Sequence, residues 1–547
     1  MNSLTTREHQ MFPVLDAAQI EIARRFASGP ARHFAAHEAL YAIGEQDAPA
    51  WFVLDGTIDI VRRDGLNPEV PITTHRVGQF SGEVNQLAGR PSIAAGRAGP
   101  EGCLALPFDA AHLRALMVGS AELGEVVMRA LILRRVGLIE VGGAGTILIG
   151  LPDSPDILRL QGFLTRSGFP HLVLDAARDS EGRALVERLG VLPDELPLVV
   201  CPGGALLRNP NDAELAGCLG MTPALDPTVV YDVAIVGAGP AGLAAAVYAA
   251  SEGLSVIVLD QHATGGQAGA SARIENYLGF PTGISGHALA ARAVNQAVKF
   301  GAEILIPVTV ENLACADDRL TLTLSGDRQV RARSVVVASG ARYRRPAIPN
   351  LATFEGAGVS YWASPIEARI CSGEEVALVG GGNSAGQAVV FLAPHVKRLH
   401  LIVRRDLAET MSRYLVDRIA AQPNVEIHVG AEITRLEGDR ASGLSFVTIM
   451  NHARGTVQRR ALRHIFLFIG ADPNAEWLGG RAATDAKGFV VTGQGALPLE
   501  TTMPGVFAIG DVRAGSTKRV AAAVGEGAAV VAQIHAMIAT RAAKRTA

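Results

Sequence analysis

The chain contains the stretch Tyr231-Asp-Val-Ala-Ile-Val236, which runs directly into Gly237-Ala-Gly-Pro-Ala-Gly242. The first six residues have the apolar character of a buried parallel strand, and the glycines follow at the spacing of a dinucleotide-binding turn. The first glycine allows a tight turn, the second lets a pyrophosphate approach the backbone, and the third lets a helix pack closely on the strand. We therefore predict a strand, a phosphate-binding turn and a helix, with Gly237, Gly239, Pro240, Ala241 and Gly242 contacting the ligand.

The strand that follows supports this interpretation. Ser255-Val-Ile-Val-Leu-Asp260 is again apolar and ends in a carboxylate. An acidic residue at the end of the second strand of such a unit accepts hydrogen bonds from ribose hydroxyls. Asp260 is therefore predicted to bind the ribose of the same nucleotide.

A second copy of the arrangement lies further along the chain. Glu375-Val-Ala-Leu-Val379 leads into Gly380-Gly-Gly-Asn-Ser-Ala385, and the next strand, Leu399-His-Leu-Ile-Val403, ends in Arg404-Arg405. Arginines can pair with a 2′-phosphate, so NADPH is favoured over NADH. The residues predicted to bind this nucleotide are Gly380, Gly382, Asn383, Ser384, Ala385, Arg404 and Arg405. Two nucleotide sites in one chain indicate hydride transfer from a nicotinamide to a flavin.

Five further motifs lie between and beyond these turns: Gly265-Gly-Gln267, Glu275-Asn-Tyr277, Ala338-Ser-Gly-Ala341, Thr501-Thr-Met-Pro-Gly-Val-Phe-Ala-Ile-Gly-Asp511 and Lys518-Arg-Val-Ala521. With the two turns, they make the chain from about residue 228 onward resemble the low-molecular-weight thioredoxin reductases. In that family an FAD domain is interrupted by an NADPH domain, and the enzyme is a homodimer. The resemblance implies that Asp511 binds the FAD ribityl chain and that Gln267 and Asn276 lie near the flavin. It adds Gly266, Gly340, Gly510, Arg519, Val520 and Ala521 to the cofactor-binding residues.

The chain departs from this family at its redox centre. Where the family has Cys-Ala-Thr-Cys, the stretch Gly358-Val-Ser-Tyr-Trp-Ala-Ser-Pro365 places Trp362 and Pro365 at the two cysteine positions. Disulfide exchange by the family's route needs a thiolate, so that route is lost. Trp362 is expected either to lie against the flavin or to fill the vacated volume. Cys371 is too far along the chain to replace the pair. The family's arginine after Arg404-Arg405 falls at Glu409, and Arg413 could compensate.

The segment between about Gly145 and Met221 alternates strand and helix. Together, Thr146-Ile-Leu-Ile-Gly150 and Leu196-Pro-Leu-Val-Val200 resemble a thioredoxin or glutaredoxin fold, in which a cis-proline precedes a strand. The dithiol of that fold is again missing and is replaced around Pro152-Asp-Ser-Pro155. We expect this block to have a structural or docking role. Pro223-Ala-Leu-Asp-Pro-Thr228 is predicted to be a linker.

The N-terminal segment contains strand-like runs at Trp51–Leu54 and Thr57–Val61, separated by Asp55-Gly56, and a helical pattern from about Asp109 to Arg135. Phe80-Ser-Gly-Glu-Val-Asn-Gln-Leu87 with Arg97-Ala98 resembles the phosphate-binding cassette of cyclic-nucleotide-binding domains. Glu83 fits the glutamate that contacts the ribose, but Ser92 or Ile93 stands where the phosphate-binding arginine belongs, and Arg90 has the wrong spacing. Two readings stay open: a cyclic-nucleotide site, or a degenerate β-roll that serves regulation or dimerisation through the helix after Asp109.

The amino-acid composition excludes several other classes of protein. The 547 residues are 48% hydrophobic and 19% charged, with a net charge of −3, so we expect a globular protein and no nucleic-acid or anionic-membrane surface. The five cysteines are at least 17 positions apart, which predicts buried thiols and no metal site. The start of the chain lacks the pattern of a signal peptide, and the apolar stretch from 233 to 250 is interrupted by glycines. A cytoplasmic protein without a membrane span is predicted.

These observations predict a multidomain α/β fold: an N-terminal β-roll, a thioredoxin-like domain, and two Rossmann-like domains. The predicted boundaries are 1–140 (cyclic-nucleotide-binding-like), 145–221 (thioredoxin-like), 228–345 and 466–547 (the two halves of the FAD domain) and 346–465 (NAD(P)H domain). The favoured function is an NADPH-dependent FAD oxidoreductase with a non-dithiol acceptor: a small molecule, a quinone, oxygen or a redox protein. The alternatives are a nucleotide or redox sensor and a thioredoxin reductase that uses a partner's cysteines. No acid–base residue is assigned.

Overall fold

The computed structural model describes residues 7–63, 69–141, 145–152, 154–222, 224–316, 319–439 and 443–546. They divide into two compact units, one made of Met1–Val236, Leu243–Thr264 and Arg292–Val335, the other of Gly237–Gly242, Gly265–Ala291 and Val336–Ala547. The predictions for the first six residues, for Asp153 and for Pro223 lie outside the described residues.

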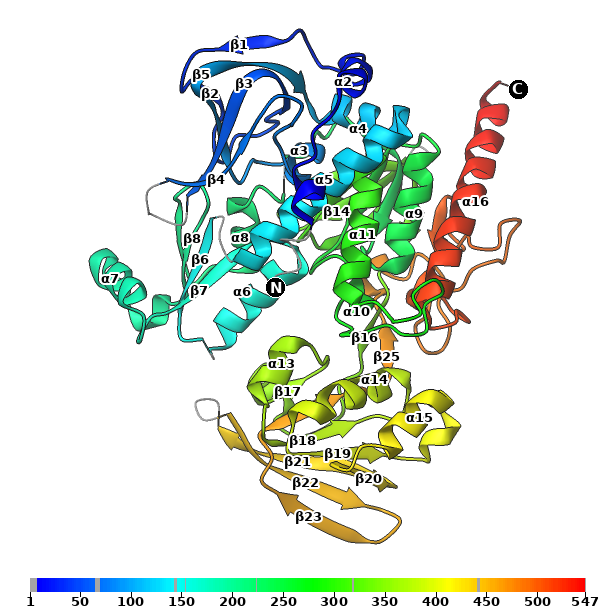
Figure 1. Cartoon of the computed structure of the whole chain (residues 1–547). Coiled ribbons are helices and arrows are strands. Elements are labelled where there is room, and N and C mark those ends of the chain that lie inside the picture. Colours follow the sequence, from blue (N-terminus) through cyan, green and yellow to red (C-terminus); the bar gives the residue numbers. More distant parts are fainter. Residues whose placement is uncertain are drawn as a thin grey trace. The chain divides into compact units, whose positions relative to one another are not determined.

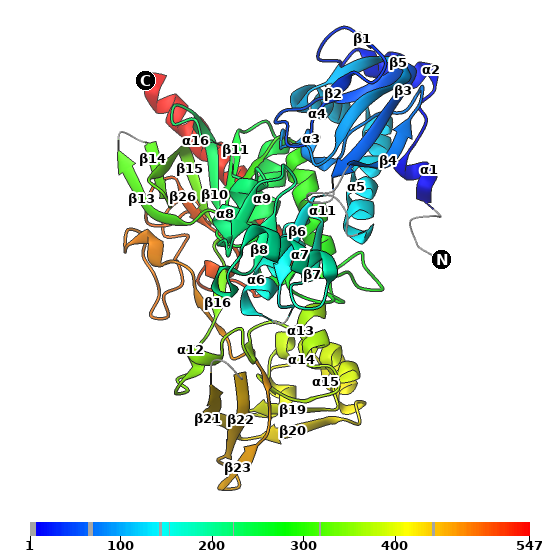
Figure 2. The ribbon, with the colours of Figure 1, turned by 90° about the vertical axis from the view of Figure 1, so that its left-hand side faces the viewer.

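The first unit begins with an antiparallel sheet of five strands in the order β1-β5-β3-β4, with β2 also paired to β5 (Figure 2). Its strands are β1 (Arg32–Phe34), β2 (Ala39–Tyr41), β3 (Ala50–Arg63), β4 (Glu69–His75) and β5 (Ala95–Phe108). Its helices are α1 (Glu8–Met11), α2 (Ala17–Arg24), α3 (Val84–Leu87), α4 (Ala110–Gly119) and α5 (Ala121–Val141). Phe52, Phe80 and Phe108 stack in its core, with ring centroids 4.4 and 4.9 Å apart.

Two details of this part differ from the sequence prediction. The predicted break at Asp55-Gly56 does not end a strand, because β3 continues through it and the register shifts there against β5. Gly56 has a φ of +69°, and a Cβ at that position would collide with the backbone of Gly102, so the glycine serves a β-bulge. The helix predicted from Asp109 to Arg135 is in fact two helices, since Ser120 between α4 and α5 is extended.

A second sheet of the same unit has the order β7-β6-β8-β9. It is built from β6 (Thr146–Gly150), β7 (His171–Asp175), β8 (Leu198–Val200) and β9 (Leu206–Arg208), with helices α6 (Pro155–Arg166), α7 (Ser180–Leu189) and α8 (Asp212–Cys218). The predicted alternation is present, with β9 in addition. Ser154 caps α6 by accepting a hydrogen bond from the Ile157 N–H, and Pro155 occupies the first helical position. The Leu196–Pro197 peptide bond is cis, as the sequence predicts.

The cysteines correct the prediction of five buried, unpaired thiols. Cys201, after β8, and Cys218, at the end of α8, form a disulfide with Cα atoms 6.4 Å apart. Cys315 is exposed, while Cys103 and Cys371 are buried. The prediction relied on spacing in the sequence, but the 17-residue connection folds back so that α8 packs beside the β8–β9 hairpin. The disulfide therefore joins the last helix of this block to its sheet.

The third sheet contains the strand that precedes the first glycine-rich turn. Its order is β12-β11-β10-β15-β14-β13; β10, β11 and β12 are parallel, and β13, β14 and β15 form an antiparallel meander. The strands are β10 (Val230–Val236), β11 (Val256–Leu259), β12 (Glu303–Leu305), β13 (Val310–Ala316), β14 (Arg319–Leu324) and β15 (Arg328–Val337). The helices of the parallel part are α9 (Pro240–Ser251) and α11 (Gly286–Lys299). Asp260 directly follows β11.

The second unit contains a parallel sheet with the order β17-β24-β18-β19-β20. Helices α13 to α15 cover one face, and the three-stranded sheet β21-β22-β23 covers the other (Figure 1). The strands are β17 (Val359–Ser360), β18 (Glu375–Val379), β19 (Arg398–Val403), β20 (Val425–Val429), β21 (Ala431–Asp439), β22 (Gly443–Asn451), β23 (Thr456–Arg460) and β24 (His464–Leu467). The helices are α12 (Leu351–Phe354), α13 (Pro365–Ile370), α14 (Asn383–Leu392) and α15 (Arg413–Ala420).

The remaining elements of this unit are α10 (Gly266–Gly269), the pair β16 (Ala341–Tyr343) and β25 (Ala471–Pro473), β26 (Val506–Ala508) and the long helix α16 (Val520–Thr546). Of the described helices, one segment, Val520–Arg541 of α16, could span a bilayer by length and composition alone, and a third of its most apolar window is buried in the protein. Core helices of globular proteins meet the same criterion, so this helix carries no conclusion about membranes.

The cysteine arrangement predicts a simple thiol count. Without reductant, the denatured protein should show three free thiols, and after full reduction it should show five. In the native protein Cys315 should react first with a thiol reagent, because burial raises the pKa of Cys103 and of Cys371 to about 11. Five thiols in the unreduced denatured protein would rule out the Cys201–Cys218 disulfide.

Candidate functional site

The first glycine-rich turn packs against a second loop of the second unit. Gly237 has a φ of +114°, and a Cβ there would overlap the carbonyl group of Ala338, nearer than any side chain permits. Only glycine fits this position, both for its backbone angle and for its contact. The turn at Gly237 and the predicted loop around Gly340 are therefore held together by direct backbone contact.

A third loop joins them through two more glycines. The Gly265 N–H donates to the Ala238 carbonyl at 2.7 Å. Gly266 has a φ of +52°, and a Cβ there would lie 3.1 Å from the Cα of Gly239. Gln267, in α10, donates its side-chain amide to the Ala341 carbonyl, and thus reaches the loop that contains Gly340. Three of the predicted motifs are thus brought together at one place.

The Gly510-Asp511 turn lies at the same place. Gly510 has a φ of +70°, and a Cβ there would be 2.9 Å from the Cβ of Ala241 on the first turn. Burial raises the pKa of the Asp511 carboxyl, an effect that the Lys518 ammonium opposes. Lys518 also donates to the Asp511 carbonyl oxygen at 2.5 Å and to the Ser516 hydroxyl at 3.1 Å. We call these four closely packed, glycine-rich loops the cradle, because turns of this kind bind pyrophosphates through their backbone.

Three residues that position these loops are not predicted from the sequence. Glu526 of α16 accepts from the Gly510 N–H and from the Arg513 guanidinium, both at 2.6 Å. Asn474 clasps Ser339: its side chain donates to the Ser339 carbonyl at 2.9 Å, and its carbonyl accepts from the Ser339 hydroxyl at 2.6 Å. A carboxylate inside the Ala- and Val-rich pattern of α16 is the one signal that could have identified Glu526.

The other residues predicted to bind the cofactor have fewer contacts with these loops. Asp260, in the first unit, accepts from the His262 N–H at 2.8 Å. Arg519, Val520 and Ala521 form the start of α16, where Arg519 and Ala521 are exposed and Val520 is partly buried. Asn276 is exposed, and none of the described contacts joins it to the converging loops. Its neighbour Glu275 forms an ion pair with Arg418 of α15.

The second glycine-rich turn follows β18. Gly380 has a φ of +144°, and a Cβ there would overlap the carbonyl group of Phe468. Ser384 hydrogen-bonds the phenol of Tyr343, whose pKa burial raises to about 12. Asn383 exchanges two hydrogen bonds with Ser412, at 2.7 and 2.9 Å. The remaining predicted residues of this turn are Gly382, which precedes α14, and Ala385, which is fully buried within it.

The arginines predicted to read the 2′-phosphate are exposed. Arg404 and Arg405 follow β19, and Arg405 lies 3.9 Å from Glu409 with 77% of its side chain exposed. Arg413 forms a 2.8 Å ion pair with Asp417 on its own helix. All three arginines are thus exposed, and Arg413 has a closer carboxylate partner than Arg405 has.

Trp362 does not fill a core volume, since its side chain is 43% exposed. Its indole N–H donates to Glu367 at 2.8 Å, and the same carboxylate accepts from the Ser364 N–H at the start of α13. Pro365 is the first residue of that helix. Cys371 is fully buried at the far end of α13. The two positions that the sequence resemblance aligns with cysteines therefore carry an exposed indole and the proline that begins α13.

The predicted cyclic-nucleotide residues are engaged in packing. Arg90 donates to the Ile304 carbonyl at 3.1 Å, and burial lowers the pKa of its guanidinium to about 10. The Ser92 hydroxyl donates to the Ala94 carbonyl at 2.7 Å. Glu83 is 5% exposed and lies 3.5 Å from Arg135 of α5. Arg90, the arginine considered for the phosphate, is therefore directed to a strand of the parallel sheet.

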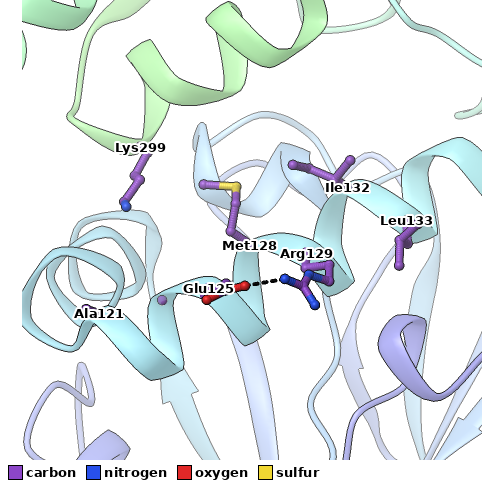
Figure 3. Close-up of a pocket in the computed structure, with 8 residues that line it drawn as sticks. Ala121, Glu125, Met128, Arg129, Ile132, Leu133 and Lys299 are labelled. Carbon is purple, nitrogen blue, oxygen red and sulfur yellow. Dashed lines mark hydrogen bonds and ion pairs between the residues drawn. The ribbon is translucent and has the colours of Figure 1, made fainter. Parts of the chain in front are cut away.

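A cavity of about 460 Å³ lies along α5, the helix predicted to serve as a contact (Figure 3). Met128 and Ile132 supply apolar walls, Glu125 and Arg129 form an ion pair, and Lys299 of α11 faces them. No thiol, histidine or carboxylate pair lines this cavity among the described residues, so we assign it no redox chemistry.

Substitution of Gly237 tests the cradle. Gly237→Ala should weaken FAD binding by about tenfold or more, since strain at a positive φ alone costs about 1–3 kcal/mol. Gly495→Ala is the matched control, because Gly495 is in the same unit and a Cβ there meets nothing within 4 Å. The measurement is flavin content per chain after dialysis. Equal flavin retention in the two variants would contradict the assignment.

Comparison with known proteins agrees with this geometry. The profile of the family described as pyridine nucleotide-disulphide oxidoreductase matches residues 231–527, more than half of the chain. A thioredoxin reductase of Mycoplasmopsis pulmonis is 33% identical over 304 residues, which cover 54% of this chain and 94% of that protein. The NADPH-dependent thioredoxin reductase 3 of Arabidopsis thaliana is 32% identical, but the match covers 56% of its length and 55% of this chain.

Two solved structures are similar as well. The thioredoxin reductase of Lactococcus lactis, in its FR conformation, is 28% identical with a TM-score of 0.53, over 57% of this chain and 99% of that one. The thioredoxin reductase of T. acidophilum is also 28% identical, with a TM-score of 0.52, over 56% and 98%. The family profile covers more than half of the chain, and the two glycine-rich turns and their contacts agree with it. The chain therefore belongs to the pyridine nucleotide-disulphide oxidoreductase family.

Proposed function

We propose that the protein is an NADPH-dependent FAD oxidoreductase that delivers electrons to an acceptor other than a dithiol at the family's usual position. The observation that carries the proposal is the contrast between two intact nucleotide-binding turns and the Trp362/Pro365 replacement of the cysteine pair. Compared with the family, the residues expected to pass electrons to the acceptor have thus changed, while the residues expected to bind the nucleotides have been kept.

The described residues fit FAD. In the cradle, a Cβ at Gly237 or Gly510 would lie within 3.0 Å of a neighbouring loop, whereas one at Gly239 would meet only Gly266, at 3.9 Å. The start of α9 would favour the charge of a pyrophosphate bound there. When bound, FAD would take a hydride from NADPH and release the electrons to an acceptor. Glu526, Arg513 and Asn474 position the loops around it. Asp511, held by Lys518, would accept from the ribityl hydroxyls.

Trp362 is proposed to shape the acceptor site. Its indole is half-exposed and fixed by a hydrogen bond to Glu367, so an apolar face is presented to solvent at the position of the lost thiols. A planar, apolar or aromatic acceptor would stack on such a face. Quinones and other small aromatic acceptors are therefore favoured over protein disulfides.

A second candidate function rests on the Cys201–Cys218 disulfide. The chain contains a disulfide of its own, outside the usual position, in a block that resembles a thioredoxin fold. Its reduction would balance as NADPH plus a proton plus the disulfide giving NADP⁺ and two thiols. This candidate makes the protein a disulfide reductase with an internal acceptor. A thioredoxin reductase that uses a partner's cysteines stays a further alternative.

The remaining assignments are also proposals. We propose domains at 1–140, 145–221, 228–345 with 466–547, and 346–465, the first a β-roll of the cyclic-nucleotide-binding type and the second thioredoxin-like. The five-stranded antiparallel sheet supports the first, and the β7-β6-β8-β9 sheet supports the second. With Arg90 directed to Ile304, a regulatory or dimerisation role is favoured over cyclic-nucleotide binding. A cytoplasmic homodimer is expected.

A double variant separates the two candidate functions. The Cys201→Ser/Cys218→Ser protein should retain its NADPH oxidation with quinone acceptors, because electrons pass from the flavin without these sulfurs. Cys315→Ser is the control for loss of an exposed thiol. Steady-state turnover with a quinone and with a thioredoxin disulfide is the measurement. Loss of turnover with every acceptor in the double variant alone would favour the disulfide reductase.

The arginine pair should set nucleotide preference. Arg404→Gln/Arg405→Gln should raise the KM for NADPH by about tenfold to ~100-fold, since a hydrogen bond to a charged group contributes about 1.5–3 kcal/mol. The KM for NADH should change little, because NADH has no 2′-phosphate. Arg435→Gln, another exposed arginine of the same unit, is the control. An equal change for both nucleotides would contradict the assignment.

A further inference from the structure

Strand register brings three potential metal ligands to one face of the parallel sheet in the second unit. His400 on β19 pairs with Glu426 on β20, and His428 lies two residues beyond Glu426. Side chains two apart on a strand point to the same face, and parallel partners share it. The three side chains therefore converge on the face that also carries Ala377 and Ile402 and packs on the β21-β22-β23 sheet.

We propose that His400, Glu426 and His428 bind one zinc ion. The site lies outside the nucleotide-binding turns and is independent of the proposed function. It also departs from the sequence prediction of no metal site. The Glu-x-His pattern of 426–428 on a strand was the signal available, but its partner histidine is 26 residues away and is identified only by strand pairing.

The distances between ligand atoms fit a tetrahedral ion. His400 Nδ1 lies 3.1 Å from His428 Nε2 and 3.3 Å from Glu426 Oε2, and His428 Nε2 lies 3.5 Å from Glu426 Oε1. With zinc–ligand bonds of about 2.0–2.1 Å, the edge of a tetrahedron is ~3.3 Å. A central ion would thus need little movement of the side chains. Three protein ligands leave a fourth position for water.

The surroundings of His400 support the assignment. Its side chain is fully buried, and its other ring nitrogen, Nε2, lies 3.5 Å from Glu375 Oε2. A carboxylate behind a ligating imidazole fixes the tautomer and the ring orientation.

Cationic side chains near the site compete with a metal ion for its carboxylates. Arg398 and Arg460 each lie 3.7 Å from Glu426, and Lys397 lies 3.2 Å from Glu375. Arg454 also adds positive charge near His428. The distances from the arginines to Glu426 exceed those of hydrogen bonds, so the carboxylate can turn toward an ion. A cavity of about 650 Å³, lined in part by Glu375, Lys397 and Arg460, lies beside these groups.

The expected consequence of binding is local stabilisation. β20 is the edge strand of the sheet, and an ion held by His400, Glu426 and His428 would tie it to β19. β19 continues directly into Arg404 and Arg405, so the ion would also brace the strand that carries the proposed 2′-phosphate site. An ion that binds the folded state alone raises thermal stability in proportion to its occupancy.

The test is equilibrium dialysis of the full-length, FAD-loaded protein, prepared without a polyhistidine tag, against zinc chloride, with metal content determined for each variant. The variants are His428→Gln, Glu426→Gln and Glu375→Gln. His452→Gln is the control, because His452 forms an exposed 2.8 Å pair with Glu432 on the neighbouring sheet. Flavin content and circular dichroism verify that each variant is folded, and thermal denaturation with and without zinc gives an independent readout.

The wild type and His452→Gln should bind about one zinc ion per chain and unfold at a higher temperature with zinc. Glu375→Gln should weaken binding by about 10- to 100-fold, as for other partners of ligating histidines, and His428→Gln and Glu426→Gln by at least as much. Substoichiometric binding by the wild type, or equal zinc affinity in His428→Gln and wild type, would overturn the proposal in favour of a hydrogen-bonded cluster. Selective loss in His452→Gln would overturn it in favour of a surface site.

Discussion

The site depends on the close approach of backbone segments that only glycine permits. Gly237 lies against the carbonyl group of Ala338, Gly266 against Gly239, and Gly510 against Ala241. A Cβ at Gly237 or Gly510 would lie within 3.0 Å of the neighbouring loop, so the loops would have to shift, whereas the 3.1 Å contact at Gly266 would require a smaller shift. Glycine-rich turns of this kind present backbone amides to their ligands, and backbone amides suit a doubly charged pyrophosphate. The residues proposed to bind the cofactor are arranged around this constraint.

Side-chain hydrogen bonds then hold in place the loops that the glycines allow to approach each other. Glu526 is the clearest case, because one carboxylate binds both the backbone of Gly510 and the guanidinium of Arg513, and so joins α16 to the turn. Asn474 plays the same part for the loop at Ser339. Trp362 differs from both. Its indole N–H donates to Glu367 and the residue is 43% exposed, which agrees with the role proposed for it at the acceptor site.

The sequence predicted those parts of the site that local backbone chemistry decides. The turns at Gly237 and Gly380 follow their strands as expected, because spacing and positive φ are local properties. Contacts between distant segments were not predictable in this way. Three such contacts depend on how strands and helices are placed in space, which cannot be read from a single sequence. They are the Cys201–Cys218 disulfide, the Glu526–Arg513 pair and the His400–Glu426–His428 cluster. The prediction of a strand break at Asp55-Gly56 was wrong for a related reason. The same dipeptide can form a turn or a β-bulge, and the partner strand decides which of the two forms.

The central claim is that NADPH reduces a flavin that does not depend on a dithiol, and anaerobic reductive titration tests it most directly. Flavin absorbance near ~450 nm should be lost after about one equivalent of NADPH per chain, with no increase in free thiols and little loss with NADH. Consumption of about two equivalents, with two new thiols, would show that the Cys201–Cys218 disulfide is the acceptor. No bleaching with either nucleotide in a protein that contains FAD would contradict the oxidoreductase function itself.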